Sequence, residues 1–304
     1  MLVLGTVLNF MRRALTPPVT QIDLERAFKQ LGMNQHTPLI VHSSLSSLGN
    51  MLGGAHSVLN ALERYSSTLV MPAFTYYTLV WPTLYRNEDW PISPGEDGPP
   101  FQSDSPVSRD IGRIPQIMLE RPNVLRSQHP ALSFAARGLE AQKILGVQTL
   151  EHPYAPIGVL EQLDALVLLL GVDHRSNTSI HYGEYMAGRP MLERWANTKN
   201  GIVRTYYPNC SAAFNGIEGS LNSLRTLDVG HATLQVARVR EIVAATGRLI
   251  ANHSESLLCS YPNCRCQNVR AKIRRDGIKP RRDIRLEEWL GFRSGLSPNE
   301  FLLE

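Results

Sequence analysis

The chain has 304 residues, of which 43% are hydrophobic and 19% are charged, and its formal net charge is +4 at pH 7. This composition excludes a disordered or fibrous chain, and the absence of a run of about 18 apolar residues argues against a membrane-spanning helix. Residues 1–15 are apolar before they are basic, the reverse of a secretory signal, so we expect an amphipathic helix that packs on the body. We predict a cytoplasmic location and one domain over 1–304, with a divergent Cys- and Arg-containing extension at 253–304.

Helical and strand patterns alternate through the first two thirds of the chain. Thr20 and Asp23 stand near the start of the first predicted helix, and the run at 165–170 is apolar throughout, as in a strand buried on both faces. Residues 76–106 show little periodicity and predict a long functional loop. We expect helices at 22–31, from the glycines at 53–54 through 62, at 114–120 and at 179–187, strands at 38–42, 68–71 and 165–170, β structure over 195–219 and a helix over 229–246.

This alternation predicts a three-layer α/β/α fold with a mostly parallel central sheet and a divergent C-terminal β/α portion. In such folds, ligands bind at the carboxyl ends of the strands. The polar clusters of this chain adjoin predicted strands, so we expect them to meet at one edge of the sheet.

The first polar cluster follows the strand at 165–170 and opens the next helix, with Asn177 or Thr178 as its N-cap. His181 lies near the helix start, and Glu184 shares its face three residues later. The helix dipole disfavours a protonated imidazole at this end of the helix. Because a histidine acts as a general base only when its imidazole is uncharged, this position suits His181 to that role. From the pattern alone, a capped helix with a buried structural histidine explains these residues as well.

Two further clusters suit an anionic ligand. In the second cluster, Ser43 and Ser44 follow His42 between a predicted strand and the glycines at 53–54. Hydroxyl groups in this position favour the binding of a phosphate or a pantetheine chain. The third cluster precedes an apolar strand and suits a charged group such as a CoA phosphate; it contains Arg126, Ser127, His129 and Ser133. Neither contains a Walker or Rossmann phosphate motif, and an ordinary polar loop explains each as well.

Metal sites are the remaining alternative from residue types. Asp173, His174, His181 and Glu184 are all ligand types, so a metal-dependent hydrolase is possible, although their spacing is not H-E-x-x-H. Cys259, Cys264 and Cys266 follow His253, and Cys210 lies upstream. Their spacing matches no standard zinc finger, so we expect buried free thiols and keep structural zinc as an alternative. The basic stretch at 265–285 predicts a solvated tail or helix face, with a zinc-stabilised nucleic-acid-binding protein as the competing hypothesis.

Four ordered motifs within residues 20–190 resemble the antibiotic N-acetyltransferase family, whose best-known members acetylate the 3-amino group of aminoglycosides. They are VHSSL at 41–45 with the glycines at 53–54, LVMPAFT at 69–75, RSxHP at 126–130 with SFAA at 133–136, and LLLGV at 168–172 continued by NTSxH at 177–181 and Glu184. This family is distinct from the GNAT acetyltransferases. Arg175 departs from the family pattern, in which many relatives carry an acidic residue.

The resemblance implies acetyl transfer from acetyl-CoA to an amine by direct attack, with His181 as general base and Glu184 supporting it or meeting the substrate. It implies a small-molecule acceptor, an aminoglycoside or another amine, in a monomer or homodimer that takes part in antibiotic resistance and binds neither nucleic acid nor membrane. Residues expected to face CoA are His42, Ser43, Ser44, Arg126, Ser127, His129, Ser133 and Phe134. Residues expected to face the acceptor are Tyr76, Asp104, Asp173, His174, Asn177 and Glu184, with an acidic wall from Glu88, Asp89, Glu96, Asp97 and Asp104.

Overall fold

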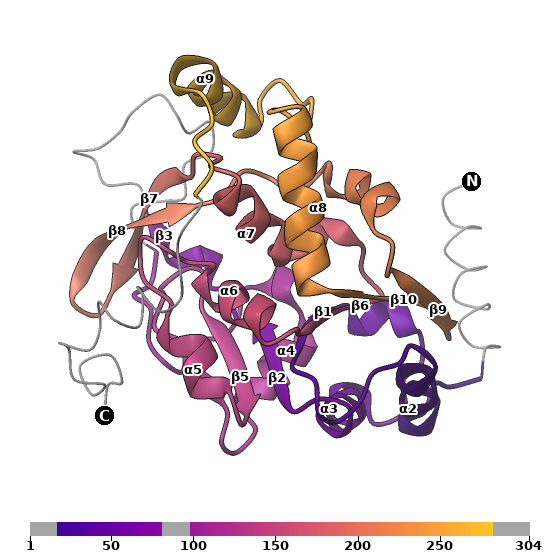
Figure 1. Ribbon diagram of the computed structural model, residues 1–304. Coiled ribbons are helices and arrows are strands. Elements are labelled where there is room, and N and C mark those ends of the chain that lie inside the picture. The colour runs from indigo at the N-terminus through magenta and orange to yellow at the C-terminus, as the bar shows by residue number, and fades with distance from the viewer. Residues whose placement is uncertain (1–16, 81–97, 282–304) are drawn as a thin grey trace, which may run out of the picture.

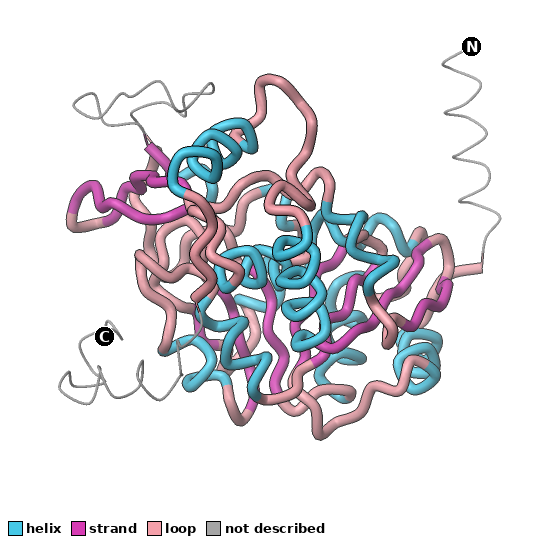
Figure 2. Tube along the Cα trace, turned by 45° about the horizontal axis from the view of Figure 1, so that its top comes forward, coloured by secondary structure: helices cyan, strands magenta, loops and turns pink. Residues whose placement is uncertain are grey.

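The apolar strands assemble into a seven-stranded sheet with the order β4-β5-β2-β1-β6-β10-β9. The computed structural model describes residues 17–80 and 98–281, and Figures 1 and 2 show the sheet between its helices. The three central strands β2, β1 and β6 are parallel, and the flanking strands pair antiparallel. The strands are β1 Leu39–Ser43, β2 Thr68–Pro72, β4 Leu125–Arg126, β5 Phe134–Gly138, β6 Leu166–Leu170, β9 Arg225–Val229 and β10 Ala232–Arg238.

Both faces of the central strands are covered, as the continuous apolar runs predict. Alternate side chains of β6 enter two separate hydrophobic cores: Leu168 packs with the first and Leu169 with the second. The first core includes buried side chains of α2, α3 and α4, and the second includes those of α5, α6, α7 and α8. Because successive strand residues point to opposite faces, the sheet needs a helical layer on each side, and the three-layer α/β/α prediction is confirmed.

Local sequence signals set several helix boundaries. Thr20 and Asp23 form a capping box at the start of α2, in which the Asp23 amide donates to Thr20 Oγ1 at 3.2 Å and the Thr20 amide donates to Asp23 Oδ2 at 2.9 Å. Gly53 has φ +73°, a conformation that favours glycine, and it precedes α3. The helices are α2 Gln21–Gln30, α3 Gly54–Arg64, α4 Arg113–Leu119, α5 Ala141–Gly146, α6 Ala155–Gln162, α7 Thr178–Met186, α8 Val239–Asn252 and α9 Cys266–Asp276.

A second, three-stranded sheet has the order β3-β7-β8, from β3 Leu79–Val80, β7 Leu192–Thr198 and β8 Gly201–Tyr207. The predicted β structure at 195–219 is therefore correct for the hairpin, but its end forms a 3-10 helix at Phe214–Ser220. The predicted long loop at 76–106 begins with a short 3-10 helix at Tyr76–Thr78 and then β3. Residues 1–15 and the acidic residues Glu88, Asp89, Glu96 and Asp97 lie outside the described residues.

The helix predicted at 229–246 is wrong in its first half. Residues 232–238 form β10, which pairs antiparallel with β6 and places Leu234 opposite Leu170 and Arg238 opposite Leu166. Leu234 and Val236 are buried while Thr233 is exposed, the alternation of a strand. The helix begins only at Val239, because the open edge of β6 provides β10 with backbone partners.

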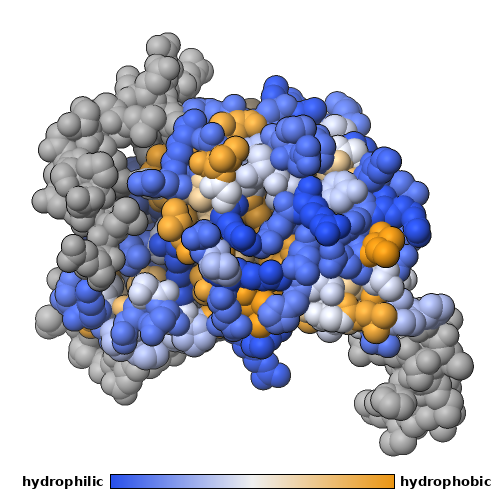
Figure 3. Space-filling view, turned by 90° about the horizontal axis from the view of Figure 1, so that it is seen from below, coloured by the Kyte–Doolittle hydropathy of each residue, from blue (hydrophilic) through white to orange (hydrophobic). Residues whose placement is uncertain are grey.

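The surface seen in Figure 3 is mostly hydrophilic, and its hydrophobic side chains form small separate groups. The large exposed hydrophobic side chains of the described residues, such as Leu139 and Tyr261, are far apart in the sequence. Within residues 17–80 and 98–281, none of the helices combines the length and the apolar character that crossing a bilayer demands.

Candidate active site

A cavity of about 920 Å³ lies where the carboxyl ends of β1 and β6 meet. Its wall contains six of the predicted site residues: Tyr76, His42, Ser43, Ser44, Asn177 and His181. Other parts of the wall come from the loop before α3, from residues 109–115 and from residues 207–211. The expectation that the first two polar clusters meet at one edge of the sheet is therefore correct.

His181 is held by a buried carboxylate. Asn177 caps α7 by accepting a hydrogen bond from the Ser179 amide at 3.1 Å, and His181 is the fourth residue of that helix. Glu184, one turn later, lies 2.8 Å from Nδ1 of His181 through its Oε2 atom. Because an ionised carboxylate only accepts hydrogen bonds, Nδ1 carries the proton and Nε2 keeps a lone pair. No described residue forms a hydrogen bond with Nε2.

Glu184 is itself anchored from two distant parts of the chain. Its Oε1 accepts a hydrogen bond from the side-chain amide of Asn209 at 2.9 Å. The same oxygen forms an ion pair with Arg189. The side chains of Glu184 and Arg189 are only 4% and 2% exposed. Arg189 also donates to the backbone carbonyls of Ser254 and Ser256, at 2.8 and 2.7 Å. Neither Arg189 nor Asn209 was predicted, because both lie outside the helix that carries the histidine.

Two aromatic rings restrict the orientation of the His181 ring. Tyr154 stacks on it with 5.5 Å between ring centroids, and Phe214 meets it edge-on at 4.7 Å. The His181 side chain is 9% exposed and lines the cavity. Together with Glu184, these contacts leave the imidazole one accessible edge, which is the geometry a general base requires.

His42 and Ser43 at the end of β1 face the same cavity. Burial, and to a smaller extent the nearby His174, lower the pKa of His42 to about 3, so this imidazole is neutral at physiological pH. Its Nε2 lies 3.4 Å from Thr178 Oγ1, and no carboxylate of the described residues forms a hydrogen bond with it. The buried Ser43 hydroxyl has no hydrogen-bond partner among the described residues. It is therefore available to donate to a ligand in the cavity.

The cavity wall is strongly basic. Among the described residues, four arginines line it against a single acidic side chain, Asp110; the arginines are Arg109, Arg113, Arg175 and Arg265. Sequence reasoning assigned none of them to the site. Arg175 was noted only as a departure from the family pattern, and Arg265 only as part of the basic stretch. Their convergence from three segments suits an anionic ligand such as a nucleotide phosphate.

The third predicted cluster does not line this cavity. Arg126 instead donates to the backbone carbonyl of Ala73 at 2.7 Å and to Ser133 Oγ at 3.1 Å, and it also binds the carbonyl of Ser105. His129 accepts hydrogen bonds at Nδ1 from the amides of residues 131 and 132, at 3.2 and 2.9 Å, and pairs through Nε2 with Thr205 Oγ1 at 2.8 Å.

The remaining members of that cluster have similar structural contacts. Ser127 Oγ accepts from the Phe134 amide at 2.8 Å, and the Phe134 ring is fully buried against Phe74. Ser133 Oγ donates to the Ala73 carbonyl at 2.8 Å. The hydroxyls and the guanidinium thus join β4 and β5 to neighbouring loops, and the contact of these residues with CoA stays a prediction.

The other predicted acceptor residues also lie off the cavity wall. Asp173 forms an ion pair with Arg175 at 2.8 Å and accepts from Asn215 at 3.0 Å. His174 is 1% exposed and contacts Asn177 through Nδ1 at 3.1 Å. Asp104 is exposed on the loop beside Arg126.

The metal-dependent hydrolase alternative fails on geometry. Among the described residues, the ligand atoms of Asp173, His174, His181 and Glu184 form no cluster that could hold a metal ion, whereas the cysteines do. Each of the four has its own protein partner instead: Arg175 for Asp173, Asn177 for His174, and the His181–Glu184 pair.

Similarity to known proteins defines the class of this α/β protein as a transferase. The family model for aminoglycoside 3-N-acetyltransferases matches residues 40–251. Aminoglycoside N(3)-acetyltransferase IV of Salmonella sp is 33% identical over 236 residues, which cover 72% of this chain and 83% of the relative. The SPbeta prophage-derived aminoglycoside N(3')-acetyltransferase-like protein YokD of Bacillus subtilis (strain 168) is 36% identical over 181 residues, which cover 56% of this chain and 66% of YokD.

A solved structure of a mutant of the aminoglycoside acetyltransferase AAC(3)-IVa, in complex with a gentamicin, superposes with a TM-score of 0.69 at 27% identity and covers 84% of this chain and 98% of that one. The chain belongs to the aminoglycoside 3-N-acetyltransferase family. The prediction of an acyltransferase of this family is therefore confirmed.

Proposed function

We propose that this chain transfers the acetyl group of acetyl-CoA to an amino group of an aminoglycoside, with His181 as the general base. One observation carries the proposal: Nδ1 of His181 is bound to the buried Glu184 while the ring lies on the wall of a large basic cavity. Family membership supports the reaction class, and the complex of the AAC(3)-IVa mutant with a gentamicin supports the acceptor class.

The chemical step follows from the two ring nitrogens. The acceptor amine attacks the thioester carbonyl, the C–S bond breaks, and CoA leaves as its thiol. Nε2 of His181 takes the proton that the nitrogen loses and passes it to the departing sulfur, and Glu184 stabilises the transient imidazolium through Nδ1. The ion pair of Glu184 with Arg189 keeps the carboxylate in position while the ring gains and loses its proton.

The negative charge that develops on the carbonyl oxygen requires a hydrogen-bond donor. The Ser43 hydroxyl is the candidate for this role, because Ser43 lines the cavity and no described residue forms a hydrogen bond with its hydroxyl. The Ser44 amide is less suitable, since it already donates to the Leu170 carbonyl at 2.9 Å. We assign the oxyanion contact to Ser43.

The basic wall suits the phosphates of CoA. Arg113 is exposed at the start of α4, and Arg265 packs its guanidinium over the Tyr207 ring at 5.3 Å from the centroid. Gly54, at the N-terminus of the eleven-residue helix α3, also lines the cavity, and no atom lies within 4 Å of where its Cβ would be. An accessible helix start is a favourable site for a phosphate.

The choice of acceptor is the part that the cavity supports least directly. An aminoglycoside is a polycation and is best bound by carboxylates, but Asp110 is the single acidic residue on the described wall. The surplus of arginines favours a second candidate, the same transfer to an amine that carries less positive charge. The two candidates share the His181 chemistry and differ only in the acceptor.

An acetyl-CoA consumption assay across a panel of amines separates the two. Aminoglycosides with a 3-amino group, simple polyamines, amino sugars and peptide amines are each supplied with acetyl-CoA, and the CoA thiol is measured. A reaction without acceptor corrects for hydrolysis and for the four cysteines of the protein itself. Turnover with aminoglycosides supports the first candidate, turnover only with other amines supports the second, and no turnover with any amine contradicts both.

A further inference from the structure

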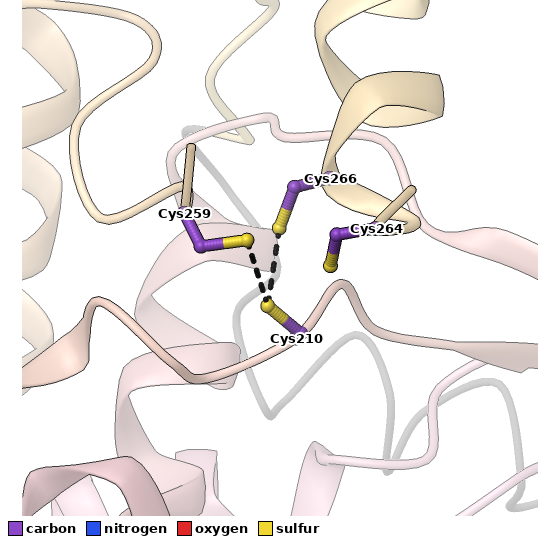
Figure 4. A group of neighbouring side chains, drawn as sticks. All are labelled: Cys210, Cys259, Cys264 and Cys266. Atoms are coloured by element: carbon purple, nitrogen blue, oxygen red, sulfur yellow. Dashed lines mark hydrogen bonds between the residues drawn. The ribbon is translucent and has the colours of Figure 1, made fainter. Parts of the chain in front are cut away.

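The four cysteines of the chain converge on one point (Figure 4). Cys210 follows β8, Cys259 lies in the loop after α8, and Cys264 and Cys266 lie at the start of α9. All four sulfur atoms lie within 4.8 Å of one another. The Sγ atom of Cys210 is 3.4 Å from that of Cys259 and 3.4 Å from that of Cys266. All four residues are free cysteines.

These distances fit the edges of a metal–thiolate tetrahedron. With Zn–S bonds of about 2.3 Å, the sulfur atoms of a tetrahedral site stand about 3.8 Å apart, which lies between the 3.4 Å and the 4.8 Å found here. We propose that Cys210, Cys259, Cys264 and Cys266 bind one structural Zn²⁺ ion. Four thiols bind Zn²⁺ by releasing four protons, and the closed set of four sulfur ligands leaves no position for substrate.

Arginines hold the backbone segments around this cluster. A zinc ion with four thiolates carries a net charge of about −2. Arg270 donates to the backbone carbonyls of Cys259 and Leu258, at 2.7 and 3.1 Å, and forms an ion pair with Glu255 at 2.8 Å. Arg265 lies between two of the cysteines in sequence and donates to the carbonyl of Asn209, next to Cys210, at 3.0 Å. Two guanidinium groups thus hold the segments that carry the ligands.

The hydrophobic cluster around the cysteines is too small to order α9 and its preceding loop by itself. Its hydrophobic cluster contains six buried residues, of which two are Cys259 and Cys266. The other four are Leu192, Leu258, Val269 and Ile273. A core of this size contributes little burial against the chain entropy of ordering α9 and its loop. A metal–thiolate site supplies the missing free energy, as it does in small zinc domains.

The cluster also borders the candidate active site. Asn209, which donates to Glu184, directly precedes Cys210, and Arg265, which lines the cavity, lies between Cys264 and Cys266. Zinc would therefore hold one wall of the cavity as well as α9. This consequence rests on the proposed function, whereas the metal site does not. Three of the four cysteines also lie beyond residue 251, where the match to the family model ends.

The test is the metal content of the full chain. The protein is purified without a metal-affinity tag and without chelator, and its zinc is measured by plasma mass spectrometry against protein concentration. We expect about one zinc per chain and, by X-ray absorption, a shell of about four sulfur atoms at about 2.3 Å. Cobalt substitution adds a second readout, thiolate-to-cobalt charge-transfer bands with the d–d bands of a tetrahedral site.

The variants are Cys264→Ser and the double change Cys264→Ser with Cys266→Ser, and Ser260→Ala on the exposed position next to Cys259 is the matched control. We expect the cysteine variants to lose zinc and Ser260→Ala to retain it. If those variants fail to fold, mercurial titration of the wild-type chain still has to release about one zinc per chain.

Zinc below about a tenth of an equivalent in protein from zinc-supplemented cells would overturn the proposal. A Cys210–Cys259 disulfide in protein prepared without oxygen would overturn it as well. Because metal content is measured without turnover, these results are independent of the acetyl-transfer assay.

Discussion

Replacing His181 by glutamine tests the proposed base directly. The amide of His181→Gln is close to the histidine in size and cannot accept a proton at neutral pH. A general base contributes about 10²–10⁴-fold to rate, which corresponds to about 2.7–5.5 kcal/mol of activation free energy. We expect kcat for acetyl transfer to fall by this factor, while the Kd for CoA changes little, because the arginines of the cavity wall are untouched.

The fold should survive this change. His181 contributes one hydrogen bond to a charged group, worth about 1.5–3 kcal/mol, and Glu184 keeps its two other donors, Arg189 and Asn209. The stability loss therefore cannot account for the loss of activity. The measurements are steady-state kinetics, CoA binding by calorimetry and urea unfolding, with the exposed His36→Ala as control. If His181→Gln retains kcat within about tenfold of wild type, His181 is not the base.

Three further predictions concern charges. Arg189→Met leaves Glu184 buried without its ion pair, so we expect a loss of about 3–5 kcal/mol in urea unfolding, and a loss below about 1 kcal/mol would contradict the pairing. Burial lowers the pKa of His129 to about 3. Below about pH 6.5, His129 is protonated in the unfolded chain and stays neutral in the folded chain. The free energy of unfolding is therefore at its full value above about pH 6.5 and falls as the pH decreases. Between about pH 7.5 and 5, His129 lowers the free energy of unfolding by about 2 kcal/mol. His129→Gln should remove this loss. If unfolding free energy depends on pH in the variant as it does in the wild type, the lowered pKa of His129 is refuted. Arg113→Gln should raise the KM for acetyl-CoA several-fold and weaken its salt dependence without changing kcat, whereas the exposed Lys199→Gln should not.

The candidate base illustrates which parts of the site local sequence can predict. His181 and Glu184 are three residues apart on one helix, so their proximity depends only on helix geometry and on the cap that Asn177 provides. The partners of Glu184 are different. Arg189 lies beyond the helix end, and Asn209 is 25 residues away. Nothing in the local pattern indicates that these side chains return to the same carboxylate.

The third motif shows the opposite case, in which polar residue types typical of an anion site contact neighbouring backbone groups of the protein. An arginine, two serines and a histidine near a strand have the residue types of an anion site. The guanidinium of Arg126 nevertheless donates hydrogen bonds to the Ala73 carbonyl and to the Ser133 hydroxyl. His129 accepts hydrogen bonds from two backbone amides. Whether a polar side chain binds a ligand or closes a loop depends on which backbone groups surround it, and only the fold decides this.

The apolar strands, the capping signals and the polar residues that follow β1 and β6 were sufficient to predict the layered α/β architecture and the position of His181. These are features of short range, because strand alternation, helix periodicity and capping act over a few residues. The tertiary structure alone decided that residues 232–238 form a strand, that four arginines share one cavity with His181, and that four cysteines share one point. Each of these depends on contacts between segments far apart in the chain, whose pairing follows from the packing of the whole domain.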